Sequence, residues 1–309
     1  MNLTIVIPCY NEEQVLPWTL GKLATLIDRL KTEASTDARL LLVDDGSRDR
    51  TWEIISEAAK AHCYISGIRL SHNEGHQGAL WAGMQESVAT SDAVASIDAD
   101  LQDDETAMID MARQINDGKD IVYGVRKKRE TDTWFKRFTA QSFYKLMKSM
   151  DSEIVYNHAD FRMMSRRAVE ALMQYPERNL FLRGIVRRLG FKEGFVYYDR
   201  RARELGESKY PLKKMLAFSI DGITSFSTAP LKFITFVGLT MTLVSLVMIM
   251  FGIIRHIEGN TIEGWTSLLV SLWFIGGIIT TAMGVTGIYI GKIYVEVKQR
   301  PRYFVQERA

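Results

Sequence analysis

Short apolar runs alternate with amphipathic stretches through the first part of the chain. The apolar runs have strand length and are Leu3–Ile7, Leu40–Val43, Ile65–Leu70, Ala93–Ile97 and Ile121–Tyr123. The stretches between them carry apolar residues at helical spacing and are Val15–Leu30, Thr51–Ala61, Gly78–Val88 and Thr106–Ile115. A regular β-α-β-α order predicts an α/β fold in which helices cover both faces of a mostly parallel sheet.

The C-terminal part has a different pattern, with two long apolar segments. Phe233–Ile254 contains no charged residue and is as long as a helix that crosses a bilayer, and Leu268–Ile290 has the same character. The segment between them is short, and basic residues flank the pair on both sides. By the positive-inside rule, both flanks lie in the cytoplasm. The pattern therefore predicts a hairpin of two transmembrane helices, whereas a buried hairpin of a soluble protein is the alternative.

These patterns divide the chain into four parts. Residues 1–210 form the predicted cytoplasmic α/β domain, 211–232 a juxtamembrane amphipathic segment, 233–291 the two transmembrane helices, and 292–309 a cytoplasmic basic tail. Apolar residues recur at helical spacing in the juxtamembrane segment, which suits a helix in the membrane interface or one packed on the domain. No signal peptide precedes the first strand, so the domain is expected to stay in the cytoplasm.

Composition adds little to this picture. The 309 residues carry a formal net charge of +2, which says little about partners, and no nucleic-acid partner is expected. Two cysteines in a chain of this length indicate neither a disulfide framework nor a metal cluster. The oligomeric state is not readable, and a homo-oligomer stays open.

Three polar motifs follow three of the predicted strands. They are Pro8-Cys9-Tyr10-Asn11-Glu12, Asp44-Asp45-Gly46-Ser47 and Asp98-Ala99-Asp100. In open α/β sheets, ligands bind beyond the carboxyl ends of the strands, so the three motifs are expected to meet in one site. For the second motif, a turn with a helix N-cap is the structural alternative, and both roles can hold together.

Asp98 and Asp100 are two carboxylates separated by one residue, where the chain leaves a strand. Such a pair can face one divalent cation, because Mg²⁺ and Mn²⁺ prefer oxygen ligands and often share them with substrate phosphates. Gln102 is placed to add a carbonyl oxygen. A solvated acidic loop is the alternative for an isolated D-x-D, but the strand context favours a metal site.

Together, the motifs resemble the donor site of family 2 glycosyltransferases, which have the Rossmann-like GT-A fold. The matching residues are Ile5–Glu13, Val43–Ser47, Asp98–Gln102 and Asn73–Leu80. With the two C-terminal apolar segments, the chain is most similar to the polyprenyl-phosphate branch, which includes dolichyl-phosphate mannose synthases and bactoprenol glucosyltransferases. The resemblance covers nearly the whole chain.

The resemblance implies roles for the matching residues. The implied donor-binding residues are Pro8, Tyr10, Glu12, Asp44, Asp45, Asp98, Ala99, Arg126, Arg203 and Lys209. The implied metal ligands are Asp98, Asp100 and Gln102, and the implied catalytic residues are Asp160 and Asp100. Arg203 and Lys209 match a late R-x-x-G-x-S-K segment, where they would contact phosphate oxygens.

Asp160 matches the acceptor side of the family pattern, in Asp160-Phe161-Arg162. It is expected to act as a base or to position the acceptor, and orienting Arg162 is the alternative. A lipid phosphate is largely ionised near neutral pH, so it needs alignment more than deprotonation. His76 lies in a matching segment but receives no role.

The implied reaction is inverting transfer of glucose or N-acetylglucosamine from a UDP-sugar to undecaprenyl phosphate, with Mg²⁺ or Mn²⁺, at the cytoplasmic membrane. A GDP-mannose donor and a non-catalytic membrane scaffold on this fold are the alternatives. A processive polysaccharide synthase would also need a Q-x-x-R-W motif and more spans, which the sequence lacks. A dinucleotide oxidoreductase would need G-x-G-x-x-G after the first strand, where Pro8–Glu12 stands instead.

Overall fold

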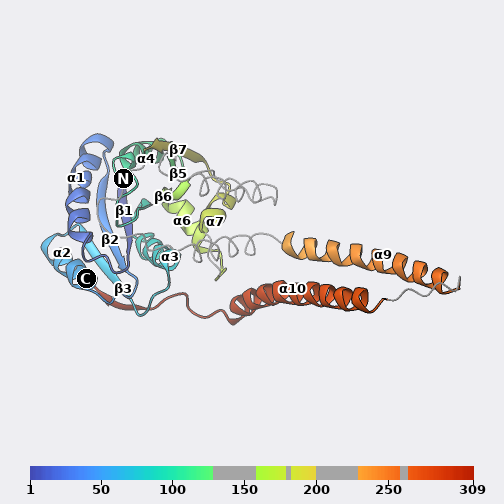
Figure 1. The fold of residues 1–309 in the computed structure, drawn as a ribbon. Helices are drawn as coiled ribbons and strands as arrows, with labels where there is room; N and C mark the ends of the chain where they lie inside the picture. The colour runs from blue at the N-terminus through green and yellow to red at the C-terminus, as the bar shows by residue number, and fades with distance from the viewer. Residues whose placement is uncertain (128–157, 179–181, 200–228, 258–263) are drawn as a thin grey trace. The chain divides into compact units, whose positions relative to one another are not determined.

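A mixed β-sheet forms the centre of the N-terminal part of the chain (Figure 1). The computed structural model describes residues 1–127, 158–178, 182–199, 229–257 and 264–309, and within them the sheet has eight strands in the order β7-β5-β6-β4-β1-β2-β3-β8. The strands are β1 (Asn2–Cys9), β2 (Asp37–Asp44), β3 (Ile65–Leu70), β4 (Ala93–Ser96), β5 (Ile121–Arg126), β6 (His158–Ser165), β7 (Glu193–Tyr198) and β8 (Val305–Arg308). Only β6 and β8 run antiparallel to their neighbours.

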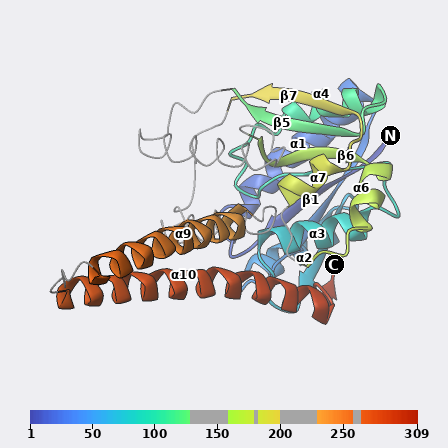
Figure 2. The same ribbon diagram turned by 90° about the vertical axis from the view of Figure 1, so that its right-hand side faces the viewer.

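Helices cover both faces of this sheet (Figures 1 and 2). One face carries α1 (Leu16–Ala34), α2 (Thr51–Ala61) and α4 (Ala107–Asn116), and the other carries α3 (His76–Ser87), α6 (Arg166–Met173) and α7 (Leu182–Arg188). Each strand and helix predicted between Leu3 and Tyr123 is present, which confirms the α/β prediction for this region.

β1 lies at the centre of the sheet and is buried on both faces. For this reason its sequence is a continuous apolar run and does not alternate. On one side it packs in a common core with the leucines of α1. On the other, a Cβ atom at Gly83 of α3 would lie 2.2 Å from Val6 Cγ1, so only glycine allows α3 to approach so closely. This close packing brings the first residues of α3 to the carboxyl end of β1.

The β6 strand was not predicted, and it determines how the site is built. It runs antiparallel between β4 and β5, with Arg162 opposite both Ser96 of β4 and Tyr123 of β5. Asp160, two residues before Arg162, therefore lies beside the end of β4, from which the chain continues to Asp98. The Ser96 hydroxyl donates a hydrogen bond of 2.5 Å to the Asp160 carbonyl oxygen, which holds Asp160 next to the end of β4.

Within the segment predicted as a basic tail, Val305–Arg308 forms the edge strand β8, which was not predicted. The pairing with β3 uses backbone groups, including the Gly67 amide to the Ala309 carbonyl at 2.8 Å and the reverse bond at 2.9 Å. Only one of the four residues of β8 is apolar. A pattern of hydrophobic positions therefore cannot reveal this strand.

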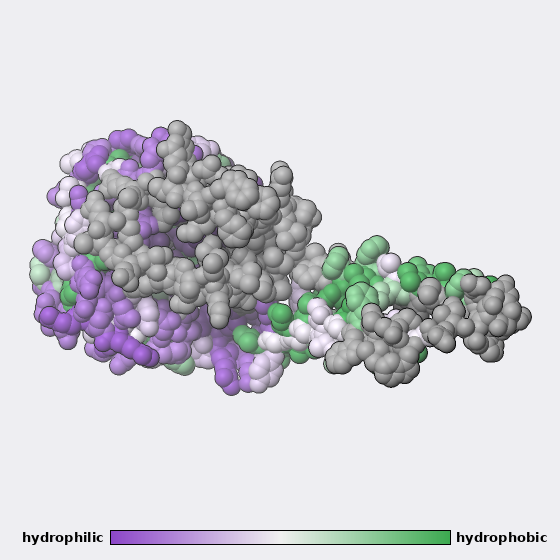
Figure 3. All heavy atoms as spheres, viewed as in Figure 1, coloured by the Kyte–Doolittle hydropathy of each residue, from purple (hydrophilic) through white to green (hydrophobic). Residues whose placement is uncertain are grey.

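Two long helices, α9 (Ala229–Ile257) and α10 (Trp265–Lys298), lie in a separate unit that spans residues 216–299. The two helices contact each other. Hydrophobic residues gather over both, in contrast to the largely hydrophilic surface of the α/β unit (Figure 3). Among the described residues, one segment, Phe274–Lys298, is long and apolar enough to cross a membrane, with a mean hydropathy of 1.5. The predicted hairpin of two spans stays a prediction, and nearly all of 211–232 lies outside the described residues.

Candidate active site

The loops that follow β1 and β2 are joined by hydrogen bonds at the carboxyl end of the sheet. Ser47 Oγ accepts from the amide of Asn11 at 3.0 Å, and Thr51 Oγ1 accepts from the amide of Glu12 at 2.8 Å. Asn11 has a φ of 53°, a left-handed conformation that asparagine adopts more readily than most residues. The structure thus brings the first two predicted motifs together, with Pro8 buried and Tyr10 exposed.

Asp44 is fully buried at the end of β2. Its Oδ1 accepts the amide of Ser47 at 3.1 Å, so it closes a turn, whereas α2 begins only at Thr51 with Arg50 as its cap residue. Its Oδ2 lies 3.3 Å from Arg69 Nε and accepts no hydrogen bond from the described residues. Burial raises the pKa of Asp44, while the Ser47 bonds and the Arg69 charge act in the opposite direction. Asp44 is thus a buried carboxylate with the Arg69 guanidinium as its charged neighbour.

Asp45 connects the second motif to the start of α3. Its two carboxylate oxygens accept the amides of Glu74 at 2.7 Å and Gly75 at 3.0 Å. Gly46 has a φ of 67°, and a Cβ atom there would lie 2.9 Å from the His72 carbonyl carbon, so glycine is required at this contact. Burial is the main reason that the pKa of Asp45 rises to about 6.

The D-x-D loop after β4 is held from its backbone. Thr19 of α1 donates from Oγ1 to the Ala99 carbonyl at 2.6 Å, which gives Ala99 a structural place in the loop. Leu101 has a φ of 42°, a conformation that costs a non-glycine residue on the order of 1 kcal/mol and is concentrated at functional sites. The backbone amide of Gln102 donates to Asp100 Oδ1 at 3.3 Å, so the two residues are close together in the loop.

Negative charge accumulates around Asp98. Burial by the surrounding protein raises the pKa of Asp98, and the carboxylates of Asp103, Asp100 and Asp160 add to this, although 44% of its side chain is open to solvent. His76 opposes the rise, with Nε2 3.5 Å from Asp98 Oδ1. A divalent cation would relieve this repulsion.

The described residues contain no group of three or more histidine, cysteine or acidic side chains arranged around one metal position. The acidic pair alone still fits the common mode of Mg²⁺ binding, in which one or two carboxylates act together with substrate phosphates and water.

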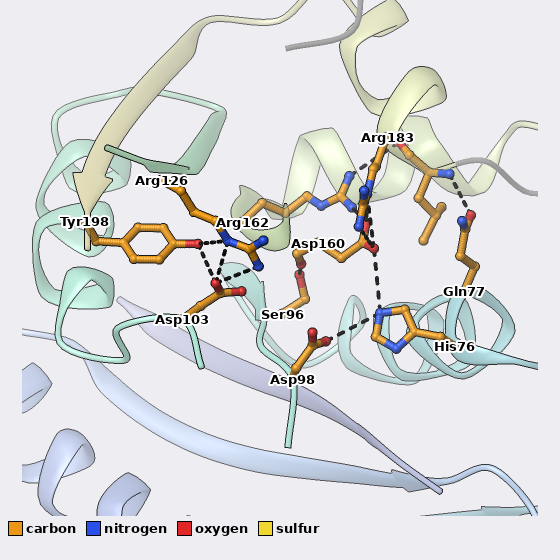
Figure 4. A network of polar contacts seen from close by, with 11 residues as sticks. His76, Gln77, Ser96, Asp98, Asp103, Arg126, Asp160, Arg162, Arg183 and Tyr198 are labelled. Carbon is orange, nitrogen blue, oxygen red and sulfur yellow. Dashed lines mark hydrogen bonds and ion pairs between the residues drawn. The ribbon is translucent and has the colours of Figure 1, made fainter. Parts of the chain in front are cut away.

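Asp160 lies at the centre of a cationic cluster (Figure 4). Its Oδ1 is 2.5 Å from Arg162, its Oδ2 is 3.0 Å from Arg183, and His76 Nε2 lies 3.7 Å away. Burial alone would raise the pKa of Asp160, but Arg183, Arg162 and His76 together hold it well below its ordinary range. A carboxylate that stays ionised in this way is a poor proton acceptor. The arrangement therefore favours the positioning role over the role of a base.

His76 and Gln77, at the start of α3, explain the matching segment Asn73–Leu80. His76 stands between Asp98 and Asp160 and so connects the predicted donor and acceptor sides (Figure 4). Gln77 Oε1 accepts the amide of Leu182 at 2.9 Å and thereby fixes the start of α7, which carries Arg183. The sequence identified the segment, but it did not reveal either contact.

Arg126, at the end of β5, is held by two residues that the sequence did not single out. Its Nη2 lies 2.8 Å from Asp103 Oδ1, and the Tyr198 hydroxyl of β7 donates to the same oxygen at 2.7 Å (Figure 4). Asp103 is buried and follows the D-x-D loop directly, so it joins Arg126 to that loop. Arg203 and Lys209 lie outside the described residues.

The raised pKa of Asp45 makes a prediction about stability and pH. Between pH 4 and 6, the folded protein binds a proton at Asp45 that the unfolded chain has released, so stability from this group falls as pH rises through that window. A shift from 3.8 to about 6 corresponds to about 3 kcal/mol. Melting of the detergent-solubilised protein and of Asp45→Asn should therefore show the wild type losing stability relative to the variant from pH 4.5 to pH 7. A constant difference would contradict the assignment.

Comparison with known proteins places this site in a family. The family model described as glycosyl transferase family 2 matches residues 4–173. The uncharacterized glycosyltransferase YkoT of Bacillus subtilis (strain 168) is 48% identical over 98% of this chain and 90% of its own length. A prophage bactoprenol glucosyl transferase homolog of Escherichia coli (strain K12) is 38% identical over 99% of both chains.

Among solved structures, glucosyl-3-phosphoglycerate synthase from Mycobacterium tuberculosis, in complex with phosphoglyceric acid, matches with a TM-score of 0.51. It is 20% identical, and the match covers 73% of this chain and 78% of that one, which supports the fold alone. The family match extends over more than half of this chain, and the relatives match along its full length. The chain therefore belongs to glycosyl transferase family 2 and is a glycosyltransferase with the GT-A fold.

Proposed function

We propose that the protein transfers a hexose, glucose or N-acetylglucosamine, from a UDP-sugar to undecaprenyl phosphate. The observation that carries the proposal is the match to a relative named as a bactoprenol glucosyl transferase homolog over 99% of both chains. The apolar segment Phe274–Lys298 is consistent with an enzyme whose acceptor stays in a bilayer. The catalytic domain then works at the cytoplasmic face of the membrane, and we retain the two-span hairpin of 233–291 as part of the proposal.

The donor side is assigned to the carboxyl ends of β1, β2 and β4. Asp44 would meet the nucleoside, together with Tyr10 and Glu12 from the loop after β1, which hydrogen bonds join to the loop after β2. Asp98 and Asp100 would hold Mg²⁺ or Mn²⁺, which when bound neutralises charge on the leaving diphosphate. Arg126 would also face the diphosphate, and Asp103 and Tyr198 hold its guanidinium in place. Arg203 and Lys209, which lie outside the described residues, remain proposed phosphate contacts.

The acceptor side is assigned to the cationic cluster around Asp160. The acceptor phosphate is largely ionised near neutral pH, so the protein has to align it and balance its charge. Arg183 is 29% exposed and is held by Asp160 through two of its nitrogens, which orients its guanidinium. The phosphate oxygen attacks the anomeric carbon while the nucleoside diphosphate leaves from the opposite side, and the anomeric configuration inverts. Asp160 serves in this scheme as a positioning residue.

A product assay tests the proposed reaction. Full-length protein in detergent micelles is incubated with undecaprenyl phosphate, Mg²⁺ and each of UDP-glucose, UDP-N-acetylglucosamine and GDP-mannose, and lipids are identified by mass spectrometry. We expect the lipid phosphate to gain one sugar from one of the UDP donors. A product from GDP-mannose alone would show that the donor is GDP-mannose and not a UDP-sugar. No product from any of them would support a non-catalytic scaffold.

The acidic pair predicts dependence on a divalent cation. A chelator should abolish transfer, and Mg²⁺ or Mn²⁺ should restore it. Asp100→Asn keeps the side-chain shape but removes the charge, and it should lower turnover by roughly a hundredfold or more. Asp110→Asn is the matched control, because Asp110 is an exposed carboxylate of α4 paired with Arg113. It should keep full activity. Undiminished transfer in chelator would remove the metal from the proposal.

Asp160→Asn separates positioning from base catalysis. Breaking a buried ion pair costs about 3–5 kcal/mol, so the variant should melt earlier and turn over more slowly. Because Asp160 stays ionised throughout the working range, the pH–rate profile should keep its wild-type shape. UDP binding, measured by calorimetry, should change little.

Asp120→Asn provides the control for lost stability, since Asp120 is a buried carboxylate paired with Arg167 at 2.6 Å near the start of β5. It should lower the melting temperature without slowing turnover at a permissive temperature. If Asp160→Asn loses the acidic limb of the pH–rate profile, Asp160 is a base after all.

A further inference from the structure

We propose that the C-terminal strand β8 completes the donor site, because Glu307 positions Arg69 and Arg69 in turn holds Asp44. The inference rests on the proposed role of Asp44 in nucleoside binding. Glu307 and Arg69 are positioning residues in this scheme and need not touch the substrate. In this scheme, β8 contributes indirectly to nucleotide binding.

The two sides of the connection meet at the β3–β8 pair. Arg69 is directly opposite Glu307 in the antiparallel register, and the pairing shifts immediately after it, between Arg69 and Leu70. Side chains of directly opposed residues lie on the same face and interact. The backbone bonds between Gly67 and Ala309, and from the Ser71 amide to the Phe304 carbonyl, hold the register on both sides of this pair.

Glu307 is fixed through both of its oxygens. Oε2 accepts from the indole nitrogen of Trp52 at 3.0 Å, and Oε1 accepts from Nη1 of Arg69 at 3.0 Å. The first contact limits the rotamers of Glu307, so the second can hold the Arg69 guanidinium in one place. Without this partner, a partly exposed arginine, here with 28% of its side chain accessible, extends its charged end into water.

Arg69 carries the connection to the buried carboxylate. Its Nε lies 3.3 Å from Asp44 Oδ2, and its Nη2 donates to the Ser47 carbonyl at 3.5 Å. Since Oδ2 of Asp44 accepts no hydrogen bond from the described residues, this guanidinium is the nearby charge that stabilises the ionised carboxylate. Displacing it would leave a fully buried anion with less compensation, at the position proposed to meet the nucleoside.

Other contacts hold the tail independently of Glu307. Arg308 forms two hydrogen bonds, of 2.6 and 3.0 Å, with Glu86 of α3. The Arg302 guanidinium lies 3.7 Å from the centre of the Trp81 ring and donates to the Tyr175 and Glu177 carbonyls. Glu307 can therefore be altered while the strand stays in place, which makes the proposal testable by a single side-chain change.

The central experiment measures nucleotide affinity in full-length Glu307→Gln. The amide oxygen can still accept from Trp52, but the ion pair with Arg69 is lost. For a partly exposed pair, we expect the dissociation constant for UDP and the KM for the UDP-sugar to rise about two- to fivefold, with kcat nearly unchanged. Glu307→Asp keeps the charge and should recover part of the affinity. Arg308→Gln, on the same strand, should bind nucleotide like the wild type.

A double-mutant cycle then tests the connection itself. Arg69→Gln leaves the sequence of β8 unchanged and should weaken nucleotide binding more than Glu307→Gln. It also provides the test if Glu307→Gln does not fold. Adding Glu307→Gln to Arg69→Gln should cause no further loss, because Glu307 acts through Arg69. Independent, additive losses would overturn the proposal. So would wild-type affinity in Glu307→Gln, or an equal loss in Arg308→Gln, which would indicate a purely structural tail.

The outcome is separable from that of the proposed function. If the wild type binds GDP in place of UDP, the donor assignment fails, and the same cycle is run with GDP. If the wild type binds neither nucleotide, the role of Asp44 fails, and the present inference fails with it.

Discussion

Asp160 is a buried anion, and an uncompensated buried charge costs several kcal/mol, so the surrounding chain has to bring cations to it. It does so with Arg162 of its own strand β6 and with Arg183 of α7, while His76 of α3 lies close by. Satisfying this one carboxylate therefore fixes how β6, α7 and the start of α3 meet. The position of Asp98 follows, because β4 pairs with β6 and His76 also faces Asp98.

The same contacts separate charge across the site. On one side, burial and then the nearby carboxylates of Asp103 and Asp100 raise the pKa of Asp98. On the other, Asp160 is outnumbered by the arginines beside it. His76 lies at the border between the two regions. Under the proposed function, the acidic side would suit a metal-bound diphosphate and the cationic side an anionic acceptor.

The sequence predicted the elements whose signal is local. Hydrophobic runs and helical spacing identified β1 to β5 and α1 to α4, and the strand-end motifs identified most residues at the carboxyl edge. β6, β7 and β8 were missed, since their presence depends on pairing with distant strands. The partners Asp103, Tyr198 and Arg183 were missed for the same reason: Tyr198 meets Asp103 across 95 positions. A contact between residues so far apart leaves no periodic pattern in the sequence, and none of these residues belongs to a recognisable motif.

The order of strands in the sheet also bears on how the protein is made. β3 is synthesised before both long helices, whereas its edge partner β8 is synthesised after them. Until then, β3 presents unpaired backbone groups, and an open edge of this kind can recruit another strand. The sheet therefore closes at this edge only after both long helices have been made. A chain that lacks β8 would expose the edge of β3, which makes it prone to pair with strands of other chains.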